Sequence, residues 1–166
     1  MMKKTVTEAP PIRIREATEQ DVNFIFSSWL KSYRDSSFAK SITNTVYFHE
    51  HHKLIEELLK TCKVLVACDN NNIGDIFGYT VTEEIEGQFV THFSYVKHTY
   101  RNLGIAKALF KEAGADFTKL SLYTHSTKNS DRFAEKYNLV HSPYIAFMKQ
   151  YRVKEHVEAK DESDSN

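Results

Sequence analysis

The sequence predicts an α/β fold with a mixed sheet, formed by a single domain. Short segments of alternating or continuous apolar residues are typical of strands, and longer segments carry apolar residues at helical spacing. These segments interleave in the order strand, helix, helix, three strands, helix, strand, helix, strand, which is an α/β arrangement. The chain has 166 residues, of which 41% are hydrophobic, so it is long enough and apolar enough to bury one core.

The first half of the chain holds the first strand, two helices and the second strand. Residues 12–16, IRIRE, alternate apolar and charged side chains, as a half-buried strand does. Thr18 and Asp21 approximate a capping box that opens a helix. Residues 36–45 predict a loop or a broken helical turn, and residues 63–69, KVLVACD, predict a buried strand. The apolar stripes of the two helices comprise Val22, Ile25, Phe26, Trp29, Leu30 and Tyr33 in the first, and His51, Leu54, Ile55, Leu58 and Leu59 in the second.

The second half of the chain adds further strands and two helices. Strands are expected at residues 76–84, 89–97, 119–124 and 144–151, with a turn at Glu86 and Gly87. One helix is expected along the stripe of Ala106, Leu109, Phe110, Ala113 and Phe117, and the other over residues 129–137. Because side chains alternate across a strand, His92 and Ser94 are expected to share one face of the sheet.

The composition favours a single folded domain in a reducing, cytoplasmic setting. We expect a flexible N-terminus over residues 1–10, one domain over residues 11–151 and a charged, flexible tail over residues 152–166. The net charge is zero, which gives no support for binding nucleic acid or an anionic membrane. No signal peptide or membrane-spanning stretch is evident. Cys62 and Cys68 form no zinc or redox motif, and Cys68 is expected to be buried.

The loop before the third helix has the pattern of an anion site. Residues 101–106 are Arg-Asn-Leu-Gly-Ile-Ala, and they follow a strand directly. The first N–H groups of a helix have no partner within it, and the helix dipole favours negative charge there. Gly104 lets a ligand approach the backbone, and Arg101 adds a cation beside a phosphate. The pattern suits a pyrophosphate, but it matches neither the Rossmann fingerprint nor the P-loop, and an ordinary strand-to-helix turn with a surface arginine explains it equally well.

The same residues resemble a known binding motif. Val96, Arg101, Gly104 and Ala106, followed by a helix, resemble the acetyl-CoA-binding motif of the Gcn5-related N-acetyltransferase (GNAT) superfamily. The order of elements over residues 12–151 is also similar to that family. The resemblance implies a GNAT fold, with a mixed, mostly antiparallel twisted sheet flanked by helices. The stretch around the motif also resembles GNAT proteins of bacteriophages.

The resemblance implies a cosubstrate and a reaction. It implies acetyl-CoA, with direct transfer of the acetyl group to an amine in a ternary complex, the amine being on a small molecule or a protein. It places the pyrophosphate on the loop amides and the pantetheine on the backbone of the preceding strand. The implied cofactor-binding residues are Tyr95, Val96, Lys97, Arg101, Asn102, Leu103, Gly104, Ile105, Ala106 and Asn129.

Acetylation of an amine also needs a base, because the amine must be neutral to attack. The family often places that base where Val90 or His92 stands here, and only His92 can serve. A hydrogen-bonded histidine within a sheet is the alternative interpretation. The family tyrosine that protonates the leaving thiolate corresponds to Ala134, which is a clear departure. Ser94 and Tyr137 are therefore the candidate catalytic proton donors.

The acceptor side of the site is expected between the first two helices. The candidate substrate-binding residues are Trp29, Tyr33, Tyr47 and His125. A solvent-facing loop position is the alternative for His125. Residues 48–52, FHEHH, contain no H-E-x-x-H pattern, and we expect no metal.

Two functions from different classes are consistent with these residues. The first is an acetyl-CoA-dependent N-acetyltransferase, supported by Arg101, Gly104, Ala106 and His92. The second is a catalytically weak or inactive module of the same fold that binds CoA or a protein partner, supported by Ala134. A fold does not fix a function, so both are kept. No membrane or nucleic-acid partner is expected, and a homodimer is left open.

Overall fold

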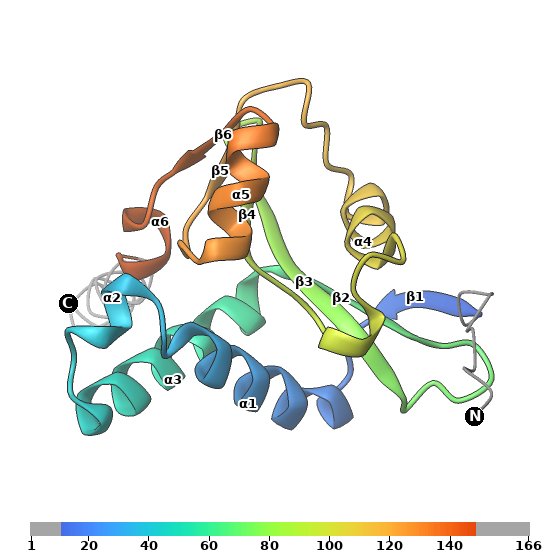
Figure 1. The fold of residues 1–166 in the computed structure, drawn as a ribbon, viewed down its shortest axis with the longest axis horizontal. Coiled ribbons are helices and arrows are strands. Elements are labelled where there is room, and N and C mark those ends of the chain that lie inside the picture. Colours follow the sequence, from blue (N-terminus) through green and yellow to red (C-terminus); the bar gives the residue numbers. More distant parts are fainter. Residues whose placement is uncertain (1–10, 149–166) are drawn as a thin grey trace, which may run out of the picture.

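The computed structural model of the chain describes residues 11–148, and its centre is a sheet of six strands in the order β1-β2-β3-β4-β5-β6 (Figure 1). Neighbouring strands from β1 to β4 run antiparallel, whereas β4, β5 and β6 run parallel. The strands are β1 Ile12–Glu16, β2 Lys63–Asp69, β3 Ile76–Ile85, β4 Gln88–Val96, β5 Ser121–Tyr123 and β6 Leu139–His141. The predicted mixed, mostly antiparallel sheet is confirmed.

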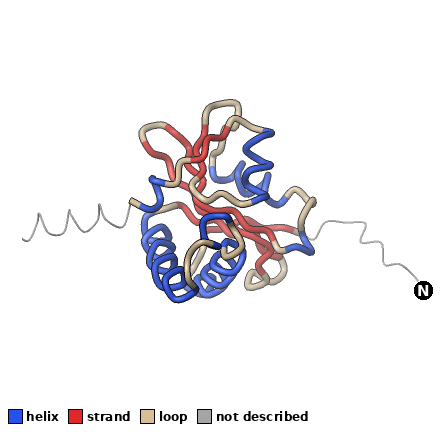
Figure 2. The backbone as a smooth tube through the Cα atoms, turned by 60° about the vertical axis from the view of Figure 1, so that its left-hand side comes forward, coloured by secondary structure: helices blue, strands red, loops and turns tan. Residues whose placement is uncertain are grey.

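Helices cover both faces of this sheet. Figures 1 and 2 show α1 and α3 side by side under one face, while α4 lies on the other face and α5 beside β6. The helices are α1 Val22–Tyr33, α2 Ser37–Lys40, α3 Asn44–Thr61, α4 Ile105–Ala113, α5 Lys128–Lys136 and α6 Tyr144–Phe147, with 3₁₀ turns η1 Glu19–Asp21 and η2 His98–Tyr100. Across residues 11–148, none of the helices has the length and apolarity needed to span a bilayer.

Two apolar clusters hold the helices against the sheet. The larger cluster lies under α1 and α3, where the Trp29 ring stacks on Phe93 with centroids 4.6 Å apart. The smaller cluster lies under α4, where Ile105 and Leu109 pack on Phe77. The buried residues Ile25, Trp29, Tyr33, His51, Leu54, Ile55 and Leu58 confirm the core-facing sides of the two predicted stripes. Cys68 is buried as expected.

The end of the described chain differs from the sequence-based expectation. A final strand over residues 144–151 was expected, but Tyr144–Phe147 form the short helix α6 and the sixth strand is Leu139–His141. Pro143 accounts for the difference, because its φ of −65° suits the start of a helix, and its carbonyl accepts a hydrogen bond from the N–H of Ala146. Residues 149–151, like the predicted terminal segments 1–10 and 152–166, lie outside the described residues.

The third predicted helix is shorter than its apolar stripe suggested. It ends at Ala113, because Gly114 takes a φ of +86° and forms a left-handed C-cap. Phe117 lies beyond the helix, yet its ring still packs on Phe110 at 5.3 Å between centroids. The stripe therefore predicted the packing correctly and overestimated the helix.

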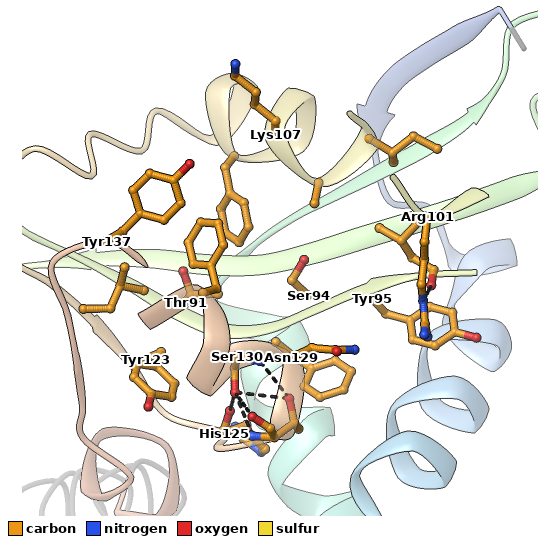
Figure 3. A pocket seen from close by; sticks show the side chains of 18 of the residues that line it. Thr91, Ser94, Tyr95, Arg101, Lys107, Tyr123, His125, Asn129, Ser130 and Tyr137 are labelled. Carbon is orange, nitrogen blue, oxygen red and sulfur yellow. Dashed lines mark hydrogen bonds between the residues drawn. The ribbon is translucent and has the colours of Figure 1, made fainter. Parts of the chain in front are cut away.

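A β-bulge in β4 changes which face its side chains occupy. The ladder pairs Val81 with Phe93 and Thr82 with Thr91, which leaves His92 as an extra residue. The bulge invalidates the expectation that His92 and Ser94 share a face, since strict alternation is lost between them. Ser94 points toward α4 (Figure 3), whereas His92 points toward Glu83, the residue that contacts Cys62 at the end of α3.

Close approach of β3 to β4 requires a glycine at position 78. A Cβ atom there would lie 2.4 Å from the carbonyl oxygen of Tyr95 and 3.1 Å from the Cα of Val96. We expect Gly78→Ala to lower the free energy of unfolding by about 1–3 kcal/mol, because backbone atoms must move. Gly74→Ala is the control, as its nearest neighbour would be a side-chain oxygen at 3.6 Å. Equal urea denaturation midpoints for the two variants would contradict this account.

Candidate functional site

A pocket of about 600 Å³ opens where β4 and β5 separate. The two strands are paired only through Val90 with Leu122 and Thr91 with Tyr123. Beyond these pairs β4 continues to Val96 without a β5 partner, and side chains from β4, the following loop, α4 and α5 enclose the space. Figure 3 shows Lys107 of α4 on one side of this space and His125 on the other. The pocket is therefore a consequence of the sheet topology.

The loop before α4 has the backbone conformation that an anion site needs. Gly104 has a φ of +79° and Asn102 a φ of +64°, so the chain turns sharply just before the helix. The Arg101 side chain donates from Nε to the carbonyl oxygen of Val96 at 3.0 Å, which fastens the loop to the end of β4. The first amides of α4 have no partner within the helix and lie at the pocket, which Gly104 and Ala106 line.

Most of the predicted cofactor-binding residues do gather at this pocket. Those that line it are Tyr95, Val96, Arg101, Asn102, Gly104, Ile105, Ala106 and Asn129. The side chain of Lys97 lies elsewhere, with Nζ 5.1 Å from the centroid of the Phe24 ring and 3.9 Å from Oδ1 of Asp75. Leu103 is 41% exposed and does not line the pocket. Only the backbone of these two residues remains available for the predicted role.

The predicted catalytic residues also line the pocket, in different environments. Ser94 is half-buried beneath α4, and Tyr137 is exposed at the end of α5, where its ring packs on Phe133 at 4.6 Å. The His92 side chain is fully buried, with Nδ1 3.0 Å from Oγ1 of Thr124 and Nε2 3.5 Å from Oε1 of Glu83. Burial means that His92 does not present an open face to a substrate in this conformation.

His92 begins a buried chain of polar side chains that runs away from the sheet. Oγ1 of Thr124 lies 3.0 Å from Nδ1 of His92 and 2.9 Å from Nδ1 of His125. Nε2 of His125 lies 2.9 Å from Nε2 of His51, which belongs to α3. Each contact joins two groups that both donate and accept, so the protons along the chain can all point one way or all point the other.

Burial holds the imidazoles of His51 and His125 neutral. Burial lowers the pKa of His51 from 6.5 to about 4. Burial also lowers the pKa of His125 well below 6.5, and the neighbouring His51 adds to that shift. An uncharged imidazole donates through one nitrogen and accepts through the other, which is what the contacts between Thr124, His125 and His51 require.

Three predicted substrate-binding residues belong to the core and not to the pocket. Trp29 is fully buried against Phe93, and Tyr33 packs edge-on to His125 with ring centroids 4.7 Å apart. Tyr47 is buried and donates its hydroxyl hydrogen to the carbonyl of Leu30 at 2.6 Å. The structure places these three side chains in the core, and their role in substrate binding stays a prediction. The fourth, His125, does line the pocket and is buried, so the solvent-facing alternative is wrong.

Several residues of the site were not predicted from the sequence. Thr124 links two histidines, and Asp131 accepts hydrogen bonds from Tyr123 at 2.9 Å and from Ser126 at 2.8 Å. Lys107 lies one residue beyond the predicted motif and also lines the pocket, with its side chain extending from α4 toward solvent (Figure 3). The Lys107 position follows from helical geometry, because it is next to Ala106 in the first turn. Nothing in the local sequence indicates the Thr124 and Asp131 contacts.

The FHEHH segment does not bring its histidines together. His51 points into the core, while His49 is exposed beside Glu50 and His52 stacks on the ring of Phe26 at 4.3 Å. The segment lies within α3, so neighbouring histidines point in different directions. Only His51 takes part in the buried chain next to the pocket.

The chain is similar in structure to acetyl transferases. A protein from Pyrococcus furiosus described as a "Putative acetyl transferase" superposes with a TM-score of 0.53 at 22% identity, over 75% of this chain and 90% of that one. A ribosomal-protein-alanine N-acetyltransferase from Brucella melitensis biovar Abortus 2308 gives a TM-score of 0.49 at 16% identity, over 75% and 89% of the chains. A GNAT family acetyltransferase from Brucella melitensis in complex with acetyl-CoA gives 0.45 at 18%, over 74% and 80%.

These similarities concern the fold. The match to the Pyrococcus furiosus protein agrees with the six-stranded open sheet flanked by helices, and the expected fold, a mixed sheet with helices on its faces, is thereby confirmed. No family model matches the sequence, and the search of curated proteins gives no significant match. Identities this low assign no reaction to the chain, so the function is argued from the pocket.

The buried histidines make the stability of the fold depend on pH. Unfolding returns His51 from a pKa of about 4 to 6.5, so at pH values between these the unfolded chain binds more protons and stability falls as pH falls. We expect the free energy of unfolding to drop between pH 7 and pH 4, with His51 contributing up to about 3 kcal/mol. His51→Gln should flatten this dependence in urea titrations, and His49→Gln, at an exposed position, should not. If the free energy of unfolding changed with pH in the same way in wild type and His51→Gln, His51 would not be the source of the pH dependence.

Proposed function

We propose that this chain transfers an acetyl group from acetyl-CoA to an amine, by direct transfer in a ternary complex. The observation that carries the proposal is the pocket between the separated β4 and β5, which has the Gly104 turn and the start of α4 in its wall. The fold of the chain is similar to that of a putative acetyl transferase, and this similarity supports acetyl transfer as the reaction class. The acceptor amine is on a small molecule or a protein, and a cytoplasmic setting is part of the proposal.

The pocket has the groups that acetyl-CoA requires. Amides at the start of α4 and the side chain of Arg101 suit the negative phosphates. The stretch of β4 beyond Thr91 has no β5 partner, which leaves a strand edge for the amides of the pantetheine arm. A backbone N–H on that edge would also stabilise the oxyanion that forms when the amine attacks the thioester.

The reaction needs one proton to leave the amine and one to reach the leaving sulfur. We propose that His92 is the base, acting through a water molecule, because its own ring is enclosed. The amine nitrogen then attacks the carbonyl carbon, and collapse of the tetrahedral intermediate breaks the C–S bond. The CoA thiolate takes a proton from Tyr137, Ser94 or water.

A second function is favoured by one observation. Ala134 occupies the position in α5 where the family tyrosine would stand, and the ring of Tyr137 packs on Phe117 and Phe133. A chain that binds acetyl-CoA but acetylates no amine would be such an inactive binding module.

Two measurements separate the two functions. Thermal unfolding with acetyl-CoA, with AMP as the control ligand, tests binding. Release of the free CoA thiol in the presence of a panel of amines tests catalysis. No shift with acetyl-CoA would exclude both functions that use this pocket.

The turn at Gly104 provides a matched test of cosubstrate binding. Gly104 and Gly114 both have positive φ, at +79° and +86°, and a Cβ at either position would meet nothing within 4 Å. We expect Gly104→Ala and Gly114→Ala to lose similar stability, about 1 kcal/mol each, from the strained backbone. Only Gly104→Ala should lose acetyl-CoA affinity, by about ten-fold or more in calorimetric titration, because only Gly104 lines the pocket. Equal acetyl-CoA affinities of the two variants would show that the loop at Gly104 does not bind the cosubstrate.

The role of His92 is tested by kinetics. We expect His92→Gln to lower kcat by about 10²–10⁴-fold with little change in acetyl-CoA affinity, since only proton removal is affected. The acid limb of the pH–rate profile should disappear in this variant. His49→Gln, at an exposed position on α3, is the control and should keep the wild-type rate. A folded His92→Gln variant with an unchanged pH–rate profile would show that the base lies elsewhere.

A further inference from the structure

We propose that Cys62, Glu83 and His92 form a binding site for a zinc ion on the α3 face of the sheet. One potential ligand atom from each residue lies within 4.8 Å of the other two. Nε2 of His92 lies 3.5 Å from Oε1 of Glu83, and Sγ of Cys62 lies 2.8 Å from Oε2 of the same carboxylate. The three side chains come from different parts of the chain and meet at one point.

Three separate elements hold the ligands in place. Cys62 is the C-cap residue of α3, where its N–H donates to the carbonyl of Leu58. Glu83 lies in β3, and His92 is the extra residue of the β4 bulge, which turns it toward Glu83. Because β3 and β4 are hydrogen-bonded neighbours and α3 packs on the same face, the positions of all three ligands are set by the core. A site built on such elements is preorganised.

The donor set favours zinc over calcium and magnesium. A thiolate, an imidazole and a carboxylate are all zinc ligands, whereas calcium and magnesium take oxygen ligands alone. Zinc bonds of about 2.0–2.3 Å give a tetrahedron with edges of about 3.3–3.7 Å, which small side-chain rotations would produce from the observed separations. Cys62 is only half-buried, so a water molecule can complete the fourth position.

A second set of contacts orients the imidazole. Nδ1 of His92 lies 3.0 Å from Oγ1 of Thr124, and with the proton on Nδ1 the lone pair of Nε2 points toward Glu83. Zinc-binding histidines ordinarily make such a contact through their other nitrogen. The thiol of Cys62 donates its proton to Glu83 in the metal-free chain, and zinc binding forms the Zn–S bond as this proton passes to solvent.

The sequence alone did not indicate this site. Cys62 and Glu83 are 21 residues apart, and the absence of a recognised zinc spacing led to the expectation of no metal. The site depends on the β4 bulge and on the end of α3, neither of which produces a motif. The FHEHH segment contributes no ligand to it.

Zinc at this site would also affect the proposed acetyl transfer, a consequence that rests on the proposed function. The metal takes the lone pair of Nε2 of His92 and fixes the proton on Nδ1, so His92 could no longer accept a proton. Bound zinc should therefore inhibit the enzyme, and Cys62→Ser should relieve the inhibition. The zinc site itself does not depend on whether the chain catalyses acetyl transfer.

The test is titration of the full chain with Co²⁺, followed by displacement with Zn²⁺. Wild type should give a sulfur-to-cobalt charge-transfer absorption that saturates at one equivalent and disappears when Zn²⁺ is added. Cys62→Ser and Glu83→Gln should each lose or strongly weaken this signal. Glu84→Gln is the matched control, because Glu84 is the exposed neighbour of Glu83 in the same strand and should leave the signal unchanged.

Further variants separate a built site from adventitious binding. Thr124→Ala should weaken Co²⁺ affinity about 10–100-fold, since it removes the group that orients His92. Saturating Zn²⁺ should raise the Tm of wild type by about 5–10 °C and that of Cys62→Ser much less. No charge-transfer absorption in folded wild type, or the same absorption in folded Cys62→Ser, would overturn the proposal. Either result leaves acetyl-CoA binding untouched, so it is distinguishable from failure of the proposed function.

Discussion

The separation of β4 from β5 is the constraint on which the candidate site depends. Parallel pairing between them stops at Thr91 and Tyr123, so the remaining polar backbone of β4 on that side must find other partners. The loop at Arg101 supplies one of them, through the bond from its guanidinium to Val96. The opening created in this way is lined by a strand edge, a helix start and a row of side chains from α5. One interruption of the sheet thus defines the position of the pocket and the polarity of its walls.

The same interruption explains why histidines accumulate behind the pocket. Where the two strands part, Thr124 turns its hydroxyl inward between His92 and His125. A polar group buried at such a point must be hydrogen-bonded, and a neutral imidazole satisfies a hydroxyl on either side. His51 completes the row from α3, which ties the helix layer to the end of β5. The row is thus a structural link made of groups that each donate and accept a proton.

Local patterns in the sequence predicted the elements and the loop, because these depend on neighbouring residues. The alternation of residues 12–16, the two helical stripes and the Gly104 turn all appear in the structure as expected. The His92 bulge was not predictable, since it depends on how β4 registers against β3. The burial of Trp29 and Tyr33 followed from the stripe of the first helix, whereas the core position of Tyr47 was not predicted, because an aromatic residue near an expected pocket suits packing and binding equally well.

The two walls of the pocket differ in how firmly they are attached to the rest of the molecule. Strands β1 to β4 form one antiparallel unit with α1, α3 and α4 packed against it, whereas β5 and β6 add only three residues each and α5 contains no fully buried side chain. Regions with few buried apolar contacts open at a lower free energy than the core does. We therefore expect α5 and β6 to open at a lower free energy than the antiparallel unit does. Their amides will exchange hydrogen for deuterium through local opening, and a ligand that bridges both walls will slow that exchange by joining the two walls into one unit.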